Sequence, residues 1–167
     1  MKTKVFSLLV NNNAGLLSRV AGLFSRRGYN IDSITSGATM DDRITRITVV
    51  ATGDTQILSQ IEKQLAKLED VLDIKILKDG ESVCRELIMA KVKANAMQRS
   101  EIISIADIFR AKIVDVEAES MMLEMTGTTS KVEAFLKLLS GYKILELART
   151  GLTGLSRGSE GIYVPED

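Results

Sequence analysis

A run of polar and small residues near the amino terminus carries most of the chain's capacity to bind a ligand. It reads Asn-Asn-Asn-Ala-Gly-Leu-Leu-Ser-Arg over residues 11–19 and joins a predicted strand to a predicted helix. The first amides of a helix lack backbone acceptors and carry partial positive charge, which suits a carboxylate. Gly15 has no Cβ, so a ligand can approach its backbone closely. Asn12 and Asn13 offer amide oxygens to an ammonium group.

Leu16 and Leu17 add apolar surface beside this loop, so the segment suits a small amino acid with an aliphatic side chain. The alternative is that the asparagines only cap the helix and Gly15 only eases the turn. A second polar segment, residues 28–33, follows the same helix. Its local interpretation is a glycine that ends the helix, with Asn30 in the turn.

Most of the residue types that catalytic sites need are missing. The chain has 167 residues, with no histidine, no tryptophan and a single cysteine, Cys84. Without histidine there is no imidazole base, no Ser-His-Asp relay and no histidine metal ligand. One cysteine cannot form an internal disulfide, which fits a reducing compartment. The glycine-rich residues 151–158 match no phosphate-loop pattern, so we expect a mobile end or a strip that docks a partner.

Charge and hydrophobicity further narrow the class of protein to which the chain can belong. The 22 basic and 22 acidic residues give a net charge of zero, which argues against nucleic-acid binding. Hydrophobic residues make up 45% of the chain, enough for a packed core. The longest early apolar run, residues 5–10, is too short for a signal peptide or a membrane span, so a cytoplasmic protein is expected.

Hydrophobic spacing predicts the same order of elements in each half of the chain. In the first half we expect a strand, a helix, a two-stranded hairpin, a helix and a strand, over residues 4–10, 16–28, 29–38 with 44–51, 54–68 and 71–77. In the second half the same order recurs over residues 87–94, 102–109, 113–117 with 121–126, 130–141 and 143–150. Ser130 and Glu133 form a capping-box pattern at the start of the last helix.

The repeat is also visible in the residues themselves. Val20-Ala-Gly-Leu-Phe24 aligns with Ile105-Ala-Asp-Ile-Phe109, and Thr52-Gly53 aligns with Thr126-Gly127. Two βαββαβ units therefore follow one another, which predicts an α+β fold of two tandem ferredoxin-like domains, each with an antiparallel sheet and helices on one face. We expect domains at 1–78 and 83–167, with 79–82 as the linker. Domains of this size are small for a stable core, so pairing is expected.

Four segments together resemble one family, the small regulatory subunits of acetolactate synthase (acetohydroxyacid synthase). They are residues 12–19, 28–31, 61–65 and 154–158, and the resemblance extends over essentially the whole chain. It implies an N-terminal ACT domain and a C-terminal ACT-like domain. It also implies feedback inhibition in branched-chain amino acid biosynthesis, through binding of valine or a related amino acid. The small subunit would activate a separate catalytic subunit that holds thiamine diphosphate, FAD and magnesium and condenses two pyruvates to acetolactate.

The resemblance also implies where the effector binds. The family's ligand loop falls on four residues of one chain, and the facing strand of the partner chain supplies two more: Asn12, Gly15, Leu16 and Ser18, then Asn30 and Ile31. The site would therefore need a homodimer formed through the ACT domains. No cofactor and no catalytic residue is expected in this chain, which lacks a thiamine diphosphate signature.

Other functions are open to a chain of this design. The main alternative is a free-standing amino-acid sensor that regulates another enzyme or a transcription factor. An RNA-binding ferredoxin-like module would need aromatic residues on its sheet, and the predicted strand 44–51 has none. The sequence does not rank valine, leucine and isoleucine as effectors, because one methylene changes the binding free energy by only ~1–3 kcal/mol.

Overall fold

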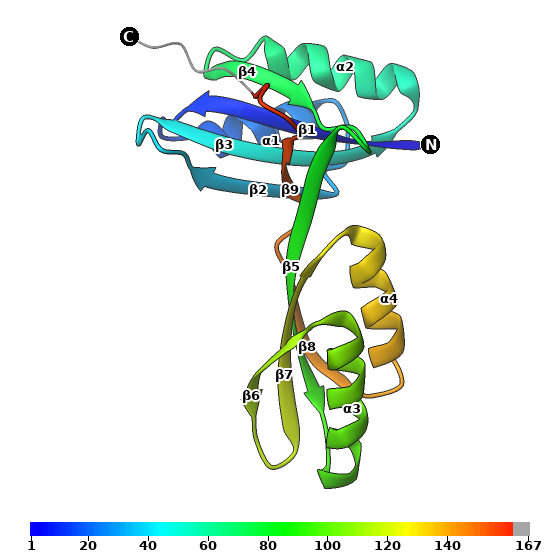
Figure 1. Cartoon of the computed structure of the whole chain (residues 1–167). Helices are drawn as coiled ribbons and strands as arrows, with labels where there is room; N and C mark the ends of the chain where they lie inside the picture. Colours follow the sequence, from blue (N-terminus) through cyan, green and yellow to red (C-terminus); the bar gives the residue numbers. More distant parts are fainter. Residues whose placement is uncertain (162–167) are drawn as a thin grey trace. The chain divides into compact units, whose positions relative to one another are not determined.

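A computed structural model describes residues 1–161 and contains the two expected βαββαβ repeats, followed by one short strand (Figure 1). The first repeat consists of β1 (Lys2–Asn11), α1 (Leu16–Arg26), β2 (Ser33–Ala38), β3 (Ile44–Gly53), α2 (Thr55–Ala66) and β4 (Val71–Ile76). The second consists of β5 (Ser82–Lys93), α3 (Ala96–Phe109), β6 (Lys112–Val116), β7 (Ser120–Gly127), α4 (Thr129–Leu139) and β8 (Ile144–Arg149). The added strand is β9 (Thr153–Ser156).

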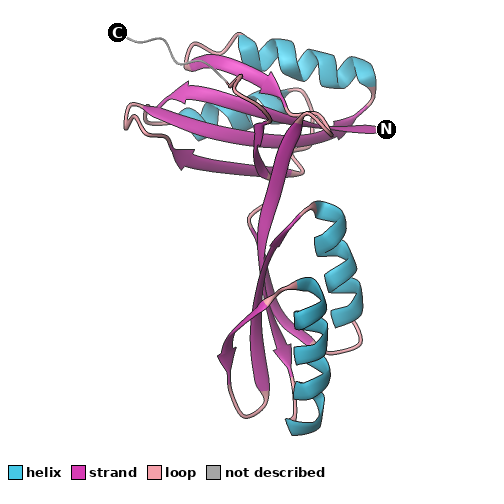
Figure 2. Cartoon of the chain, in the orientation of Figure 1, coloured by secondary structure: helices cyan, strands magenta, loops and turns pink. Residues whose placement is uncertain are grey.

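Each repeat forms one antiparallel sheet with its two helices on one face (Figure 2). The strand order is β2-β3-β1-β4 in the first sheet and β6-β7-β5-β8 in the second, so equivalent strands occupy equivalent places. The aligned segments of the repeat also correspond: Phe24 and Phe109 lie in the last turns of α1 and α3, while Gly53 and Gly127 end β3 and β7. The predicted fold class is confirmed.

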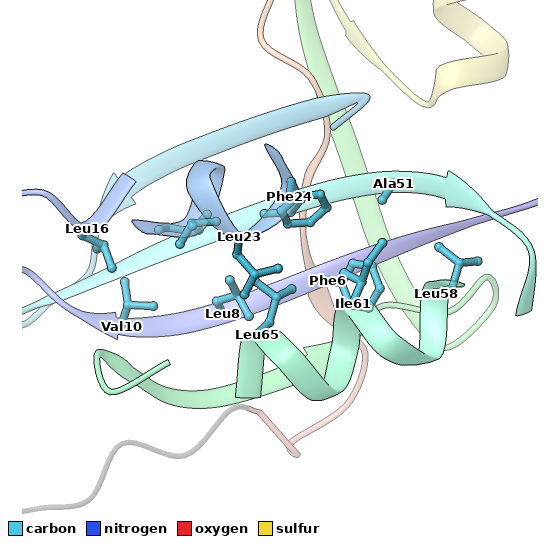
Figure 3. Packing of buried hydrophobic residues seen from close by; sticks show 13 residues of the cluster. Phe6, Leu8, Val10, Leu16, Leu23, Phe24, Ala51, Leu58, Ile61 and Leu65 are labelled. Carbon is cyan, nitrogen blue, oxygen red and sulfur yellow. The ribbon is translucent and has the colours of Figure 1, made fainter. Parts of the chain in front are cut away.

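The period of two in the central strands builds the first core. Phe6, Leu8 and Val10 of β1 are fully buried on the helix-covered face, and Figure 3 shows side chains of α1 and α2 packed against them. In β3, Ile47, Val49 and Ala51 share that face, while the intervening Arg46 and Thr48 lie on the other, as alternation requires. Asp54 caps α2 by accepting a hydrogen bond from the Ile57 amide, as predicted.

The second core repeats this arrangement with different residues. Ile88, Ala90 and Val92 of β5 are fully buried beneath α3 and α4. Phe109 of α3 meets Phe135 of α4 with ring centroids 5.3 Å apart, a tilted pair that adds to the packing of the two helices.

Two local predictions were wrong. Tyr29 and Ile31 alternate like strand residues, but both lie in a loop and pack onto the core from there, so β2 begins only at Ser33. The last helix is capped by Thr128, whose hydroxyl accepts from the Lys131 amide, and Ser130 already lies inside the helix. Because β7 ends at Gly127, the cap lies two residues earlier in the chain than predicted.

The carboxyl-terminal glycine-rich segment is ordered, contrary to the expected mobile end. Its strand β9 pairs with the start of β5, and Gly154 lies so close to β5 that an added Cβ would be 2.6 Å from Cys84 Sγ. The described residues accordingly divide into two compact units, 1–84 with 152–161, and Arg85–Gly151. Residues 152–161 thus pack with the first unit, whereas the sequence analysis assigns them to the second domain, 83–167. Within residues 1–161, no helix is long and apolar enough to cross a membrane.

Candidate effector site

The helix α1 begins without a side-chain cap. Its N-cap is Gly15, with φ of 80°, and no side chain accepts a hydrogen bond from the first turn. The side chains of the neighbouring asparagines bind elsewhere. Asn12 Nδ2 donates to the Asp42 carbonyl at 3.1 Å, and Asn13 Nδ2 donates to Asp70 Oδ1 at 2.8 Å. The interpretation of these residues as helix caps is therefore wrong. The Leu16 amide donates to the Asn13 carbonyl at 3.3 Å, which leaves the Leu17 and Ser18 amides of the first turn for an external acceptor.

A buried carboxylate holds this loop in place. Asp70, between α2 and β4, is only 9% exposed, and it accepts hydrogen bonds from Asn13 Nδ2 and, at 2.7 Å, from Arg19 Nε. The backbone carbonyl of Asp70 also accepts from the Asn11 amide at 2.8 Å. The hydrogen bond from Asn13, followed by that from Arg19, lowers the pKa of the Asp70 carboxyl below its ordinary value. The carboxylate consequently stays charged and ties both ends of the loop to β4.

Arg19 places a positive charge beside Gly15. Its Nη2 lies 2.6 Å from Asp70 Oδ2 and its Nη1 donates to the Ala14 carbonyl at 3.3 Å. A Cβ built on Gly15 would lie 3.2 Å from the same Nη1. The side chain of Arg19 is 47% exposed, so its guanidinium and the start of α1 together favour an anion at this place.

Four of the six predicted effector residues lie together at this end of α1. Asn12, Gly15 and Ser18 are exposed. Leu16 is only 5% exposed and its side chain points into the core (Figure 3), so it can offer a ligand its backbone but not an apolar wall. Leu17, which is 49% exposed, is the leucine that presents apolar surface here.

The other two predicted residues lie at the opposite end of α1. Asn30 and Ile31 follow the carboxyl end of the helix, in the loop before β2 and not in a strand as expected. Asn30 donates to Asp32 Oδ1 at 3.1 Å, and Ile31 is half-buried against the core. A helix of 11 residues is about 16 Å long at 1.5 Å per residue. One chain therefore does not bring the two groups together.

The second repeat offers no equivalent binding place. Its helix α3 starts with a capping box: Asn95 Oδ1 accepts from the Met97 and Gln98 amides at 3.0 and 2.9 Å, and Gln98 Oε1 accepts from the Asn95 amide. These side chains satisfy the amides that α1 leaves unsatisfied. An effector carboxylate would have to displace them at α3.

Sequence reasoning missed Asp70, because 57 positions separate it from Asn13 and 51 from Arg19. No motif joins these residues, and only the return of β4 alongside β1 brings them together.

Across residues 1–161, no group of three or more His, Cys, Asp or Glu side chains is arranged to hold a metal ion.

Comparison with known proteins identifies the family that shares this architecture. Residues 6–73 match the AHAS small subunit-like ACT domain, and residues 85–158 match the family described as the small subunit of acetolactate synthase. The chain belongs to the acetolactate synthase small-subunit family. The resemblance based on residues 12–19, 28–31, 61–65 and 154–158 is confirmed, and the first repeat is an ACT domain.

Relatives in this family align along nearly their whole length. The probable acetolactate synthase small subunit of Methanothermobacter thermautotrophicus is 49% identical over 94% of both chains. The acetolactate synthase small subunit of Haemophilus influenzae is 46% identical over 95% of this chain and 98% of its own. The crystal structure of the small subunit from Thermotoga maritima superposes with a TM-score of 0.87 at 38% identity, covering 96% of this chain and 100% of that one.

Proposed function

We propose that this chain is the regulatory subunit of a cytoplasmic acetolactate synthase and that it binds valine or a related branched-chain amino acid between two copies of its ACT domain. The observation that carries the proposal is the start of α1. There the N-cap is a glycine with positive φ, no side chain caps the helix, and the cation of Arg19 lies alongside. Such an arrangement suits the carboxylate of a zwitterion.

The chemistry of the surrounding residues matches the rest of an aliphatic amino acid. The Asn12 amide nitrogen is engaged by the Asp42 carbonyl, so its oxygen remains as an acceptor for an ammonium group. The exposed Leu17 offers apolar contact to a branched side chain. Asp70 holds the loop in position through its hydrogen bonds with Asn13 and Arg19, and it is itself buried and not exposed to a ligand.

A second copy is needed to complete the site. Asn30 and Ile31 are separated from Gly15 by the length of α1, so they can face the loop only from another chain. β2 is an edge strand of the first sheet, and its free backbone groups can pair with a second copy. A two-fold pair would then hold two equivalent sites, or one effector per chain.

Regulation follows from linkage between the effector and the catalytic subunit. From the family resemblance we expect thiamine diphosphate, FAD and magnesium on that larger partner, where the chemistry on pyruvate would take place. An effector that binds one arrangement of the ACT pair more tightly shifts the partner with it. The inhibited partner must then tighten effector binding by the same factor, typically about 1–3 kcal/mol of coupling.

Calorimetry of the purified chain with valine, leucine and isoleucine tests the effector. Saturable binding of at least one of the three at one molecule per chain is expected, with glutamate as a control ligand that does not bind. Absence of binding by all three would remove the effector assignment.

Reconstitution with a purified catalytic subunit tests the regulatory role. Adding the chain should raise acetolactate formation, and the bound effector should lower it again. A chain that binds valine but neither associates with the large subunit nor changes its rate would instead fit the alternative, a free-standing amino-acid sensor.

A further inference from the structure

The first unit holds a cavity of about 220 Å³ that the effector site does not use. It lies on the sheet face opposite the helices, because Arg46 of β3 and Lys75 of β4 line it and their strand neighbours Ile47, Ile74 and Ile76 face the core. Leu77, just after β4, adds to the wall, and the rest comes from the segment 155–161, which contains the end of β9. The cavity therefore exists only because the carboxyl-terminal segment packs with this unit.

Both cations of the cavity lack an anionic partner among residues 1–161. Arg46 Nη1 donates to the hydroxyl of the fully buried Ser7 at 2.7 Å, and Lys75 Nζ donates to the hydroxyl of Ser156 at 3.1 Å. In the part of the chain that the structure describes, neither side chain forms an ion pair. Burial lowers the pKa of the Arg46 guanidinium, as expected for a cation that is partly desolvated without compensation.

The two cationic side chains arise from the same region of the sheet. Ser7 of β1 is the register partner of Lys75 in β4, and the Arg46 guanidinium lies over the same Ser7. Directly paired residues have Cβ atoms roughly 5 Å apart. Thr48, on the other side of Ser7 in register, is 1% exposed and its hydroxyl has no hydrogen-bond partner. This row of polar side chains is thus incompletely satisfied.

We propose that the cavity between β3, β4 and residues 155–161 is a binding site for a phosphate group. A phosphate carries up to two negative charges and accepts several hydrogen bonds, which matches a guanidinium, an ammonium and the hydroxyl of Ser159. The Ser156 hydroxyl donates to the Glu160 carbonyl at 2.8 Å and accepts from Lys75, so it positions the ammonium. Glu160 also lines the cavity and contributes one opposing charge, so the site favours a dianion over a single carboxylate. The group is either free inorganic phosphate or the phosphate of a small monoester.

This site differs from a phosphate loop in what supplies the charge. The segment 155–161 contributes walls and the Ser159 hydroxyl, while both cations come from sheet residues 29 positions apart, Arg46 and Lys75. No local sequence pattern links them. A bound phosphate would connect β3 and β4 with the carboxyl-terminal segment, so it should also slow hydrogen exchange in residues 153–161.

Titration of the full-length chain tests the proposal, with inorganic phosphate and ribose 5-phosphate as separate ligands and chloride added to equal ionic strength. Saturable binding of either ligand is expected, and the tighter one identifies the source of the phosphate. Lys75→Gln and Arg46→Gln should each weaken binding at least tenfold, Arg46→Lys less so. Lys63→Gln, which removes an exposed cation on α2, should leave binding unchanged.

Three outcomes would overturn the site. They are binding of neither ligand beyond the chloride control, parental binding by both glutamine variants, and weakening of binding by Lys63→Gln as much as by those variants, which would indicate a general charge effect. Circular dichroism checks folding, and Lys75→Gln, on an edge strand, keeps the test valid if Arg46→Gln is destabilised. Valine binding should be the same in Lys75→Gln and the parent, which separates this site from the effector site.

Discussion

Replacing Gly15 by aspartate is expected to abolish effector binding while leaving the first domain folded. Gly15 has φ of 80°, and an L residue in this left-handed region costs about 1–2 kcal/mol, with aspartate at the low end. The new carboxylate would lie beside Arg19 and the start of α1, both of which stabilise negative charge. The free energy of unfolding should therefore fall by only about 1 kcal/mol.

The loss of binding should be much larger. The aspartate carboxylate would occupy the place of the effector's own and engage the same amides. A hydrogen bond to a charged group contributes roughly 1.5–3 kcal/mol, so losing two of them costs about 3–6 kcal/mol. At about 1.4 kcal/mol per factor of ten, the affinity for valine should drop more than 100-fold.

Gly80→Asp is the matched control for this variant. Gly80 has φ of 79°, nothing lies within 4 Å of an added Cβ, and it is in the turn before β5. It carries the same backbone strain and the same added charge, away from α1. Calorimetric titration with valine and thermal unfolding should show similar stability for both variants and normal binding only for Gly80→Asp. Binding by Gly15→Asp within about threefold of the parent would refute the site, since threefold is only about 0.7 kcal/mol.

Three further substitutions test the supporting structure. Asp70→Asn should weaken valine binding about tenfold, because hydrogen bonds of a charged group contribute roughly 1.5–3 kcal/mol each. Because hydrogen bonds from Asn13 and Arg19 lower the pKa of the Asp70 carboxyl below its ordinary value, the parent should keep full affinity at neutral pH and lose it as the pH falls through that lowered pKa. Arg149→Ala should lower the unfolding free energy of the second domain by about 3 kcal/mol, measured by denaturant titration, since it leaves the buried Glu86 without its cation. Gly154→Ala should detach β9, seen as faster proteolysis, since its Cβ would meet Cys84 Sγ at 2.6 Å.

Each of these expectations has a contradicting result. Valine affinity that is equal in Asp70→Asn and the parent would mean that the loop holds itself without the carboxylate. Arg149→Ala with parental stability would mean that water reaches Glu86. Gly37→Ala, where an added Cβ meets nothing within 4 Å, is the control for Gly154→Ala, and equal proteolysis of the two would mean that the close approach at β5 relaxes without cost.

The sequence predicts the fold well because hydrophobic alternation is strong in the central strands. Residues such as Ile88, Ala90 and Val92 leave little freedom in register once the core face is buried. The edges are less determined. Tyr29 and Ile31 satisfy the same alternation from a loop, since packing onto the core needs only the correct spacing and not strand pairing.

The residues of the candidate effector site could be predicted from the sequence only in part, for a related reason. Gly15 and Asn12 lie in one short segment and carry a local signal, whereas Asp70 joins them only through the pairing of β1 with β4. The same holds for Arg46 and Lys75, which both neighbour Ser7 in the folded sheet: Arg46 donates to its hydroxyl, and Lys75 is its register partner. Contacts between distant segments have no spacing rule in a single sequence, so these residues are visible only in the structure.

Complementation between two inactive variants tests the two-chain effector site most directly. Gly15→Asp disables the loop half and Asn30→Ala the opposite half, so neither variant alone should bind valine. When the two are unfolded together and refolded, half of the pairs are mixed, and each mixed pair has one site with both halves intact. Valine binding should then return to about a quarter of the parental capacity, with parental affinity. No recovery in pairs shown to be mixed would contradict a site shared between two chains.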